Sequence, residues 1–303
     1  MKKKTNLLTH YVRRLADVHN TKRKMKAKLC LILLFVSTLS NAQTFLDSVR
    51  TGKITMDKYA QRFNDIDIFD HSVIPFKDNE KWGYKDKNSK IIIAPKYDKA
   101  SQFQNNVAVV KLNGKNGLIN KRDSIIISFG RYDDIYVFKE KRARIKKNNL
   151  FGIIDIKGYE VMPCIYKSCD NYRFGLCQLT DKNDKEGLVD LNGIIVIPFV
   201  YDDLIQMQLE GIIKAKMNGK YGYINYNNET LIRFDYDYID QPSNGMIAIK
   251  KGNKYGFINT LGEEIVPCIY DKVYPFTEYG KASVIKNGKS GYVLKDGTEK
   301  IIE

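Results

Sequence analysis

Short apolar runs bounded by turn residues follow one another along most of this chain. The runs are three to five residues long and rich in β-branched side chains, which is typical of strands rather than helices. In one clear stretch, residues 252–286, we expect three strands at 255–259, 264–266 and 282–286, with turns at Leu261-Gly262 and Tyr270-Asp271. The pattern therefore predicts an all-β fold.

A period of 34 or 35 residues runs through these strands. One glycine, often beside an aromatic residue, recurs seven times, and we call these positions the anchor glycines: Gly83, Gly117, Gly152, Gly187, Gly222, Gly256 and Gly291. A tyrosine keeps the same period at Tyr97, Tyr132, Tyr166, Tyr201, Tyr236 and Tyr270. Asp follows each tyrosine except Tyr166, which precedes Lys167. Two positions that keep one period over most of the chain predict a repeat protein.

Turn residues recur at fixed places in each repeat. Asn-Gly pairs favour tight hairpins because both residues tolerate positive φ, and they stand at Asn113-Gly114, Asn218-Gly219 and Asn287-Gly288. Another turn glycine follows six residues after the anchor at Gly158, Gly193, Gly262 and Gly297. Prolines are expected just past the second strand, where a missing N–H is tolerated, at Pro95, Pro163, Pro198 and Pro267.

These features predict seven repeats of about 35 residues, each a β-hairpin or three-stranded unit, stacked as an open curved array. Residues 72–76 resemble a lone third strand, and Ile301-Ile302 resembles a second strand with no third after it. Two partial units of this kind suit a closed, seven-bladed, propeller-like ring, and they also suit an open array with frayed ends. Thirty-five residues are few for a four-stranded blade, which takes about 40 to 45, and this favours the open array.

The N-terminus has the pattern of a secretory signal peptide, which we place at residues 1–42. Lys26 and Lys28 precede an apolar run at 29–39, and Ser40-Asn41-Ala42 matches a cleavage site. Met25 is an alternative start. Residues 43–69 are expected to be a linker with a short capping helix at 55–63, followed by the repeat domain at 70–303.

Charge supports the same division of the chain. The net charge is +15, but residues 1–42 hold ten Lys and Arg against one acid, so the remainder carries 40 basic and 34 acidic residues. This modest excess and the lack of a recognition motif argue against nucleic-acid binding. No later stretch is apolar enough for a transmembrane helix. We expect an exported monomer in the periplasm, on the outer surface or outside the cell.

Several strings resemble the WG-repeat family, also called KWG repeats. They are Lys81-Trp82-Gly83-Tyr84, the Gly-Lys-Tyr-Gly-Tyr-Ile string at 219–224, and the Ile-Val-Pro and Tyr-Asp strings that follow. The resemblance covers about residues 70–303. It implies an all-β repeat protein, of a kind often exported from bacteria, without a well-defined molecular activity. The family's Trp is kept only at Trp82, so the same ligand site is not expected in every repeat.

Catalytic, cofactor and metal sites are not predicted. His71 is the one histidine after residue 42, and no Cys-x-x-Cys motif is present. The pairs Asp133-Asp134 and Asp202-Asp203 could serve a glycosidase, but an Asp repeated with the period is better explained as a turn former. Cys169 and Cys177 could form a disulfide across one hairpin or remain free.

Candidate ligand-binding residues are aromatic and basic. A tyrosine just after the anchor glycine, as at Tyr84, Tyr223 and Tyr292, could stack on sugar rings with Trp82, or it could pack between repeats. Arg142 and Arg144 belong to a basic cluster that suits an anionic partner or a solvated strand face.

The sequence thus favours a non-catalytic, exported scaffold that binds an envelope protein. The alternative is binding, or less readily processing, of a surface glycan through the repeated Tyr and Asp positions.

Overall fold

The described part of the computed structural model, residues 69–173, 175–207 and 212–302, consists of short strands and turns and contains no helix. The chain divides into two units, residues 1–56 and 57–303, and all described residues belong to the second. The predicted signal peptide and the predicted capping helix at 55–63 lie outside the described residues.

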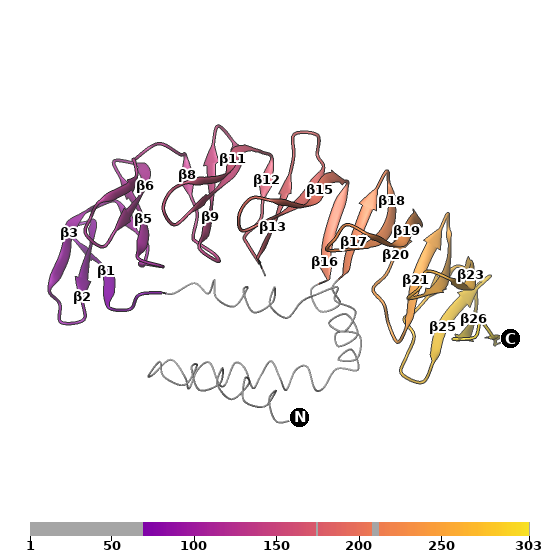
Figure 1. The fold of residues 1–303 in the computed structure, drawn as a ribbon. Helices are drawn as coiled ribbons and strands as arrows, with labels where there is room; N and C mark the ends of the chain where they lie inside the picture. The colour runs from indigo at the N-terminus through magenta and orange to yellow at the C-terminus, as the bar shows by residue number, and fades with distance from the viewer. Residues whose placement is uncertain (1–68, 174, 208–211, 303) are drawn as a thin grey trace, which may run out of the picture. The chain divides into compact units, whose positions relative to one another are not determined.

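The strands form seven small antiparallel sheets, which we number 1 to 7 in chain order (Figure 1). Sheet 1 has three strands and each other sheet has four, paired in sequence order. Sheets 2–7 begin with a short opening strand: β4 (Lys99–Ala100), β8 (Asp134–Ile135), β12 (Ser168–Cys169), β16 (Asp203–Met207), β20 (Tyr238–Ile239) and β24 (Lys272–Val273).

A hairpin and a last strand complete each sheet. The first hairpin strands are β1 (Val73–Asp78), β5 (Val107–Leu112), β9 (Arg142–Lys147), β13 (Leu176–Thr180), β17 (Ile212–Met217), β21 (Met246–Lys251) and β25 (Lys281–Lys286). The second hairpin strands are β2 (Lys81–Asp86), β6 (Lys115–Asn120), β10 (Leu150–Asp155), β14 (Glu186–Asp190), β18 (Lys220–Asn225), β22 (Lys254–Asn259) and β26 (Lys289–Leu294). The last strands are β3 (Ile91–Tyr97), β7 (Ile125–Ile127), β11 (Glu160–Tyr166), β15 (Ile195–Tyr201), β19 (Thr230–Tyr236), β23 (Glu264–Tyr270) and β27 (Glu299–Ile301).

The boundary between sheets lies at the Tyr-Asp corner and not between the predicted repeats. Within the predicted unit 252–286, β22 and β23 belong to sheet 6, while β24 and β25 belong to sheet 7. The strand expected at 72–76 is β1, which pairs with β2 inside sheet 1, and β27 pairs with β26 inside sheet 7. Neither is a leftover half-unit. The described residues therefore hold no pair of half-units that could complete a ring.

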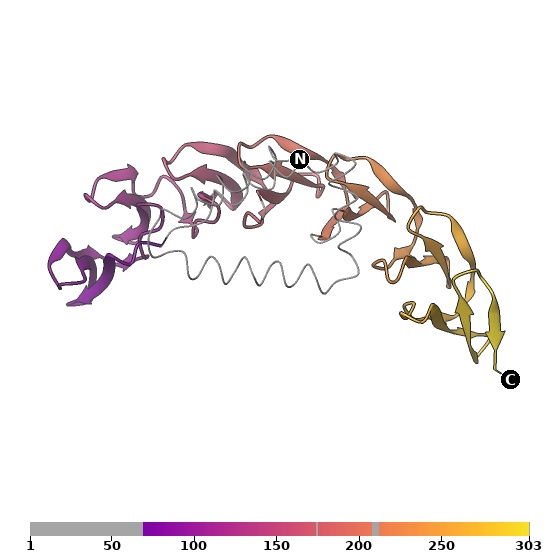
Figure 2. The ribbon, with the colours of Figure 1, turned by 60° about the horizontal axis from the view of Figure 1, so that its bottom comes forward.

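Six hydrophobic clusters join the sheets, and each cluster joins two consecutive sheets. Between sheets 5 and 6, for example, Tyr223 and Ile232 of one sheet pack with Ile247 of the next. Among the described residues, no cluster joins sheet 7 to sheet 1, as a closed ring would require. Figures 1 and 2 both show sheets 1 and 7 at opposite ends of a row. The predicted open array is confirmed.

The anchor glycines lie in the second hairpin strands, where the neighbouring last strand passes very close. A Cβ atom at Gly152 would lie 2.7 Å from the carbonyl oxygen of Met162 and 2.8 Å from the backbone nitrogen of Cys164. The last strand bulges at this point, since Phe151 pairs with Tyr166 and Ile153 with Met162. Only glycine leaves room for this crossing.

The recurring prolines lie inside the last strands and not just past them, as the sequence had suggested. Pro163 falls within β11 in the bulge between two ladder pairs, and Pro267 has the same place in β23. The sequence predicted a second strand that ended before the proline, because proline cannot donate to a ladder. In a bulge on an edge strand, the proline does not have to donate a hydrogen bond to the ladder. The strand therefore continues past the proline to Tyr166 in β11 and to Tyr270 in β23.

The predicted turns are confirmed. Asn113 and Gly114 have φ values of 50° and 75°, and Gly158 has a φ of 82°. In the turn before β11, the Asp155 carboxylate accepts hydrogen bonds from the backbone N–H groups of Lys157 and Tyr159, both at 2.9 Å. Asp and Asn therefore recur at this position because their side chains close the turn.

Candidate interaction surface

The aspartates of the Tyr-Asp corners join consecutive sheets. The Asp98 carboxylate accepts a hydrogen bond from the Lys81 ammonium of sheet 1 at 2.6 Å and another from the backbone N–H of Gly114 in sheet 2 at 2.8 Å. Asp202 makes the same two contacts with Lys185 and Gly219. The recurring Asp is thus both an ion-pair partner and a turn acceptor.

These contacts also lower the pKa values of the corner aspartates. Hydrogen bonding from Lys81 lowers the pKa of Asp98, and Lys185 does the same for Asp202. A general acid needs a raised pKa, so these two positions are poorly suited to protonating a leaving group. Of the other pair weighed for glycosidase chemistry, Asp133 accepts the backbone N–H of Asn148 at 2.7 Å.

The corner before sheet 4 is bound to its hairpin turn by an ion pair instead of a turn amide. Lys167 stands where the other corners have Asp, and its ammonium lies 2.7 Å from the carboxylate of Asp184. Asp184 has a φ of 60° and lies in the hairpin turn of sheet 4. The corner and the turn are therefore linked at this joint as well.

Tyr84 and Tyr223 are buried in the cores between sheets. The Tyr84 hydroxyl donates to the carbonyl of Ser101 at 2.7 Å, and the Tyr223 hydroxyl donates to that of Asp240 at 2.5 Å. Each bond crosses from one sheet to the next. Neither ring presents a face to a sugar, which corrects the expectation that they form stacking platforms, and packing between repeats explains them.

Trp82 and Tyr292 are half-buried and lie in sheets 1 and 7, so the structure does not bring them together. Trp82 packs against the core between sheets 1 and 2. The Lys281 ammonium lies 4.9 Å from the centre of the Tyr292 ring, within the range of a cation–π contact.

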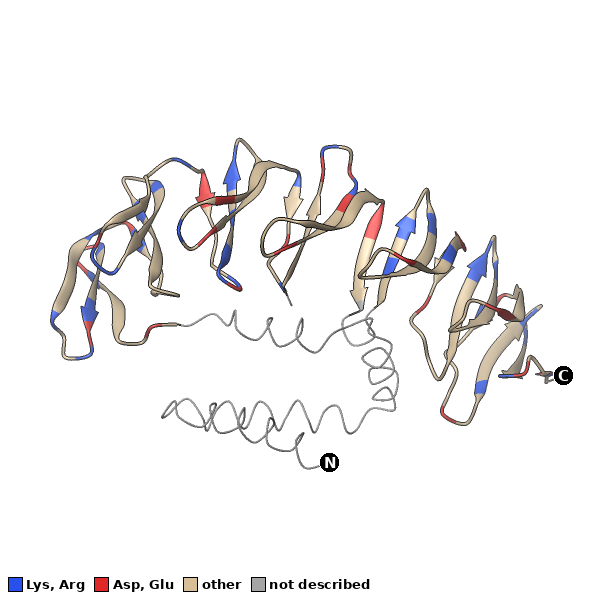
Figure 3. Cartoon of the chain, viewed as in Figure 1, with Lys and Arg blue, Asp and Glu red and all other residues tan. Residues whose placement is uncertain are grey.

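Arg142 and Arg144 reach from β9 of sheet 3 to sheet 4. Arg142 Nε donates to the carbonyl of Leu191 at 2.7 Å, and an Arg144 Nη donates to that of Cys169 at 2.8 Å. The Arg144 guanidinium also lies 4.5 Å from the Tyr136 ring centre. These arginines join two sheets, and Figure 3 shows basic and acidic positions interspersed along the strands around them.

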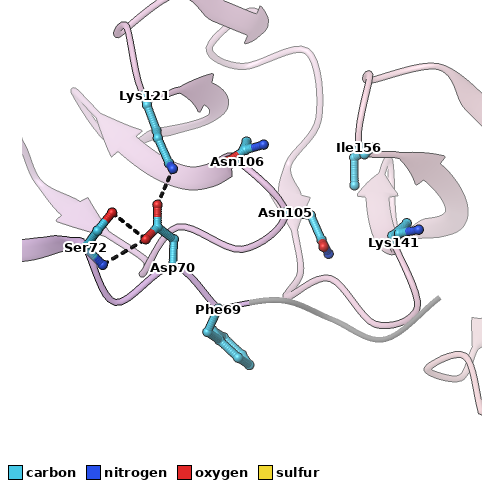
Figure 4. A pocket seen from close by; sticks show the side chains of 8 residues that line it. All are labelled: Phe69, Asp70, Ser72, Asn105, Asn106, Lys121, Lys141 and Ile156. Atoms are coloured by element: carbon cyan, nitrogen blue, oxygen red, sulfur yellow. Dashed lines mark hydrogen bonds and ion pairs between the residues drawn. The ribbon is translucent and has the colours of Figure 1, made fainter. Parts of the chain in front are cut away.

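A hollow of about 500 Å³ lies beside the residues that precede β1 (Figure 4). Its lining includes Phe69, Asp70, Lys121 and Ile156. The Lys121 ammonium pairs with Asp70 and lowers the pKa of that carboxyl to about 2. Asp70 and Lys121 therefore neutralise each other, and Lys141 is the third charged residue of the lining.

Exposed apolar side chains recur on the last strands, a feature that the sequence analysis missed. We call this set the last-strand row: Ile91, Ile92, Ile125, Ile165, Ile195, Val200, Leu231 and Ile269. The last strand is an edge strand in every sheet. The exposed fraction of Ile195 is 54% and that of Val200 is 46%. Consecutive apolar residues, as in Ile91-Ile92-Ile93, were the available signal, because a strand buried on one face would alternate.

No helix among the described residues is long and apolar enough to cross a bilayer. No group of three or more His, Cys, Asp and Glu side chains in this part of the chain is arranged to hold a metal ion.

The fold and the repeated joints define an all-β repeat protein. The WG containing repeat family matches residues 82–115, 117–151, 187–221, 221–255 and 255–289, more than half of the chain. The chain therefore belongs to the WG containing repeat family. The unmatched residues between 151 and 187 include Lys167, which replaces the corner Asp, yet they form the same strands.

No curated protein matches the chain significantly. Among solved structures, BamB from Moraxella catarrhalis is 10% identical with a TM-score of 0.31, and the match covers 78% of this chain and 86% of that chain. Kluyveromyces lactis Hsv2 is 8% identical with a TM-score of 0.32, covering 78% and 97%. A eukaryotic initiation factor is 9% identical with a TM-score of 0.35, covering 77% and 73%.

Proposed function

We propose that this protein is a non-catalytic scaffold that binds another protein through the last-strand row. The row supports the proposal because each of sheets 1–6 presents at least one exposed aliphatic side chain on its last strand. Large exposed apolar patches mark surfaces that another protein covers, and the row would form one if its members act together. The stack repeats one kind of edge, so a partner could contact several sheets at once.

Contacts of the other candidate residues favour a protein partner over a glycan. Two of the four aromatic candidates, Tyr84 and Tyr223, are buried, and the other two lie in sheets 1 and 7. The corner aspartates are engaged by lysines and turn amides, as Asp98 and Asp202 illustrate. The aliphatic last-strand row would instead be buried by apolar groups of a protein.

Export and location at the cell envelope belong to this proposal. Their support is the signal-peptide pattern of residues 1–42. The partner would then be an envelope protein, met in the periplasm, on the outer surface or outside the cell.

Affinity capture with matched variants tests the proposal. The full chain is immobilised, a native envelope extract is passed over it at moderate salt, and the retained molecules are identified. We expect one saturable protein, lost when Ile195 and Val200 are both changed to Ser. The control changes Ile205 and Tyr279 to Ser, two exposed residues outside the last strands, and should retain it.

Two results would overturn the proposal. Retention of glycan alone, released by free sugar, would replace it with carbohydrate binding. Equal loss of the partner in both double variants, with both variants folded by circular dichroism, would show that the last-strand row is not the binding surface.

A further inference from the structure

Two buried cysteines of sheet 4 lie in contact with each other. Cys169 is on the opening strand β12 and Cys177 is on the adjacent strand β13, and their Sγ atoms are 3.5 Å apart. Both belong to the core between sheets 3 and 4. The two thiols also converge on one acceptor, the carbonyl of Asp170, which lies 3.1 Å from Cys177 Sγ and 3.4 Å from Cys169 Sγ.

The other two cysteines of the described chain serve as an internal comparison. Cys164 and Cys268 are half-buried at equivalent positions on β11 and β23. Cys169 and Cys177 have no such counterpart in sheet 6, where Ile239 and Ile247 occupy the corresponding core. The close pair is therefore a property of sheet 4 and not of the repeat.

We propose that Cys169 and Cys177 form a disulfide site that is closed by a low-molecular-weight disulfide such as glutathione disulfide. One protein thiolate attacks the oxidant, which forms a mixed disulfide and releases one glutathione. The second protein thiolate then attacks the protein sulfur of the mixed disulfide and expels the second glutathione. The two protein thiols lose two protons and two electrons, and glutathione disulfide is reduced to two thiols.

The sulfur atoms already lie close, and they must approach from 3.5 Å to about 2 Å to close this bond. Cys169 pairs with Leu179, so Cys177 is its diagonal neighbour on β13, and closure also draws the two strands together locally. Access of the oxidant to the thiols limits the rate of closure, because both cysteine side chains are buried. The contact with Cys169 and burial raise the pKa of Cys177, so its reactive thiolate is scarce in the folded sheet. Closure should be fastest while sheet 4 is open, as during folding.

Peptide mapping tests the proposal on the full chain. The protein is unfolded and reduced, refolded in a glutathione redox buffer, alkylated and digested with trypsin without reduction. Cleavage after Arg173 separates the cysteines into peptides 168–173 and 174–182. We expect these two peptides to be linked, and to separate on reduction. A variant with Cys164→Ala and Cys268→Ala should keep the link.

Two findings would overturn the proposal. The first is alkylation of both Cys169 and Cys177 in refolded protein of native circular dichroism. The second is a link from either residue to peptide 158–167, which contains Cys164. Thermal unfolding gives an independent readout, because the linked protein should unfold at a higher temperature than the reduced protein. Equal unfolding temperatures for the linked and reduced forms would contradict the closure of an unstrained native bond.

Discussion

The identity of single residues follows from contacts that each repeat makes again. An anchor glycine is required because the bulged last strand crosses it, as at Gly222, where a Cβ would lie 2.6 Å from the carbonyl oxygen of Ile232. The hairpin glycine Gly219 has a different reason, a φ of 80° with nothing near its missing side chain. Two glycines three residues apart are therefore required for different physical reasons.

The substitution Gly222→Ala should destabilise the protein by about 2 kcal/mol, because its methyl group meets backbone and the strand cannot move aside without loss of pairing. Urea unfolding followed by circular dichroism measures this cost. Gly219→Asn is the matched control and should change stability little, since Asn149 holds positive φ at the corresponding turn position. Equal costs for the two substitutions would contradict the crossing-strand explanation.

Acid should weaken the joints between sheets. Lysine hydrogen bonds lower the pKa values of Asp98, Asp202, Asp237 and Asp271 below the usual value of about 4. The unfolded chain therefore binds protons at higher pH than the folded chain does. The stabilisation is present above the unfolded pKa and is lost as pH falls through the lowered folded values.

We expect the thermal midpoint to fall as the pH is lowered below about 4. Changing all four aspartates to Asn should flatten this dependence, because Asn keeps an acceptor for the turn amide but does not ionise. Thermal unfolding between pH 3 and pH 7 measures it. An unchanged dependence in the Asn variant would assign acid sensitivity to other groups.

Among the elements, the hairpins could be predicted from the sequence and the sheet boundaries could not. Asn-Gly turns and alternating short runs define the hairpins locally. Strands that continue through a bulge, as β23 does past Pro267, depend on a neighbour that the local pattern does not contain. Five of the six opening strands, such as β4, have only two residues, which is too short for any periodic pattern to indicate.

The candidate site was predicted less well, for a related reason. The local sequence around Tyr84 and Tyr223 does not tell whether their rings face solvent or the next sheet. The stacking of the sheets determines this, and it places both rings in cores between sheets. The sequence identified Arg142 and Arg144 only as members of a basic cluster. Their positions are set by hydrogen bonds to sheet 4, which the sequence does not reveal.

Removal of one hydroxyl tests the joint between sheets 5 and 6. Tyr223→Phe should cost about 1 kcal/mol in urea unfolding, because the carbonyl of Asp240 loses its donor across the joint. Tyr279→Phe is the control, since Tyr279 is 81% exposed, and should have no measurable effect. A cost as small in Tyr223→Phe as in the control would show that this hydrogen bond does not hold the sheets together.

At the scale of the whole molecule, the central claim is that the sheets of residues 69–302 remain an open array. Six cores join consecutive sheets among the described residues, and none joins the last sheet to the first. The extended binding surface proposed along the last strands requires this arrangement. The period alone did not decide it, because a ring and a row need the same repeated unit.

Small-angle X-ray scattering of the monomeric full chain tests this claim most directly. A compact body of 303 residues would have a radius of gyration of about 19 Å. The open array predicts a clearly larger radius and a pair-distance distribution with a long tail. A radius of about 19 Å with a symmetric distribution would contradict the open array, and with it the extended binding surface.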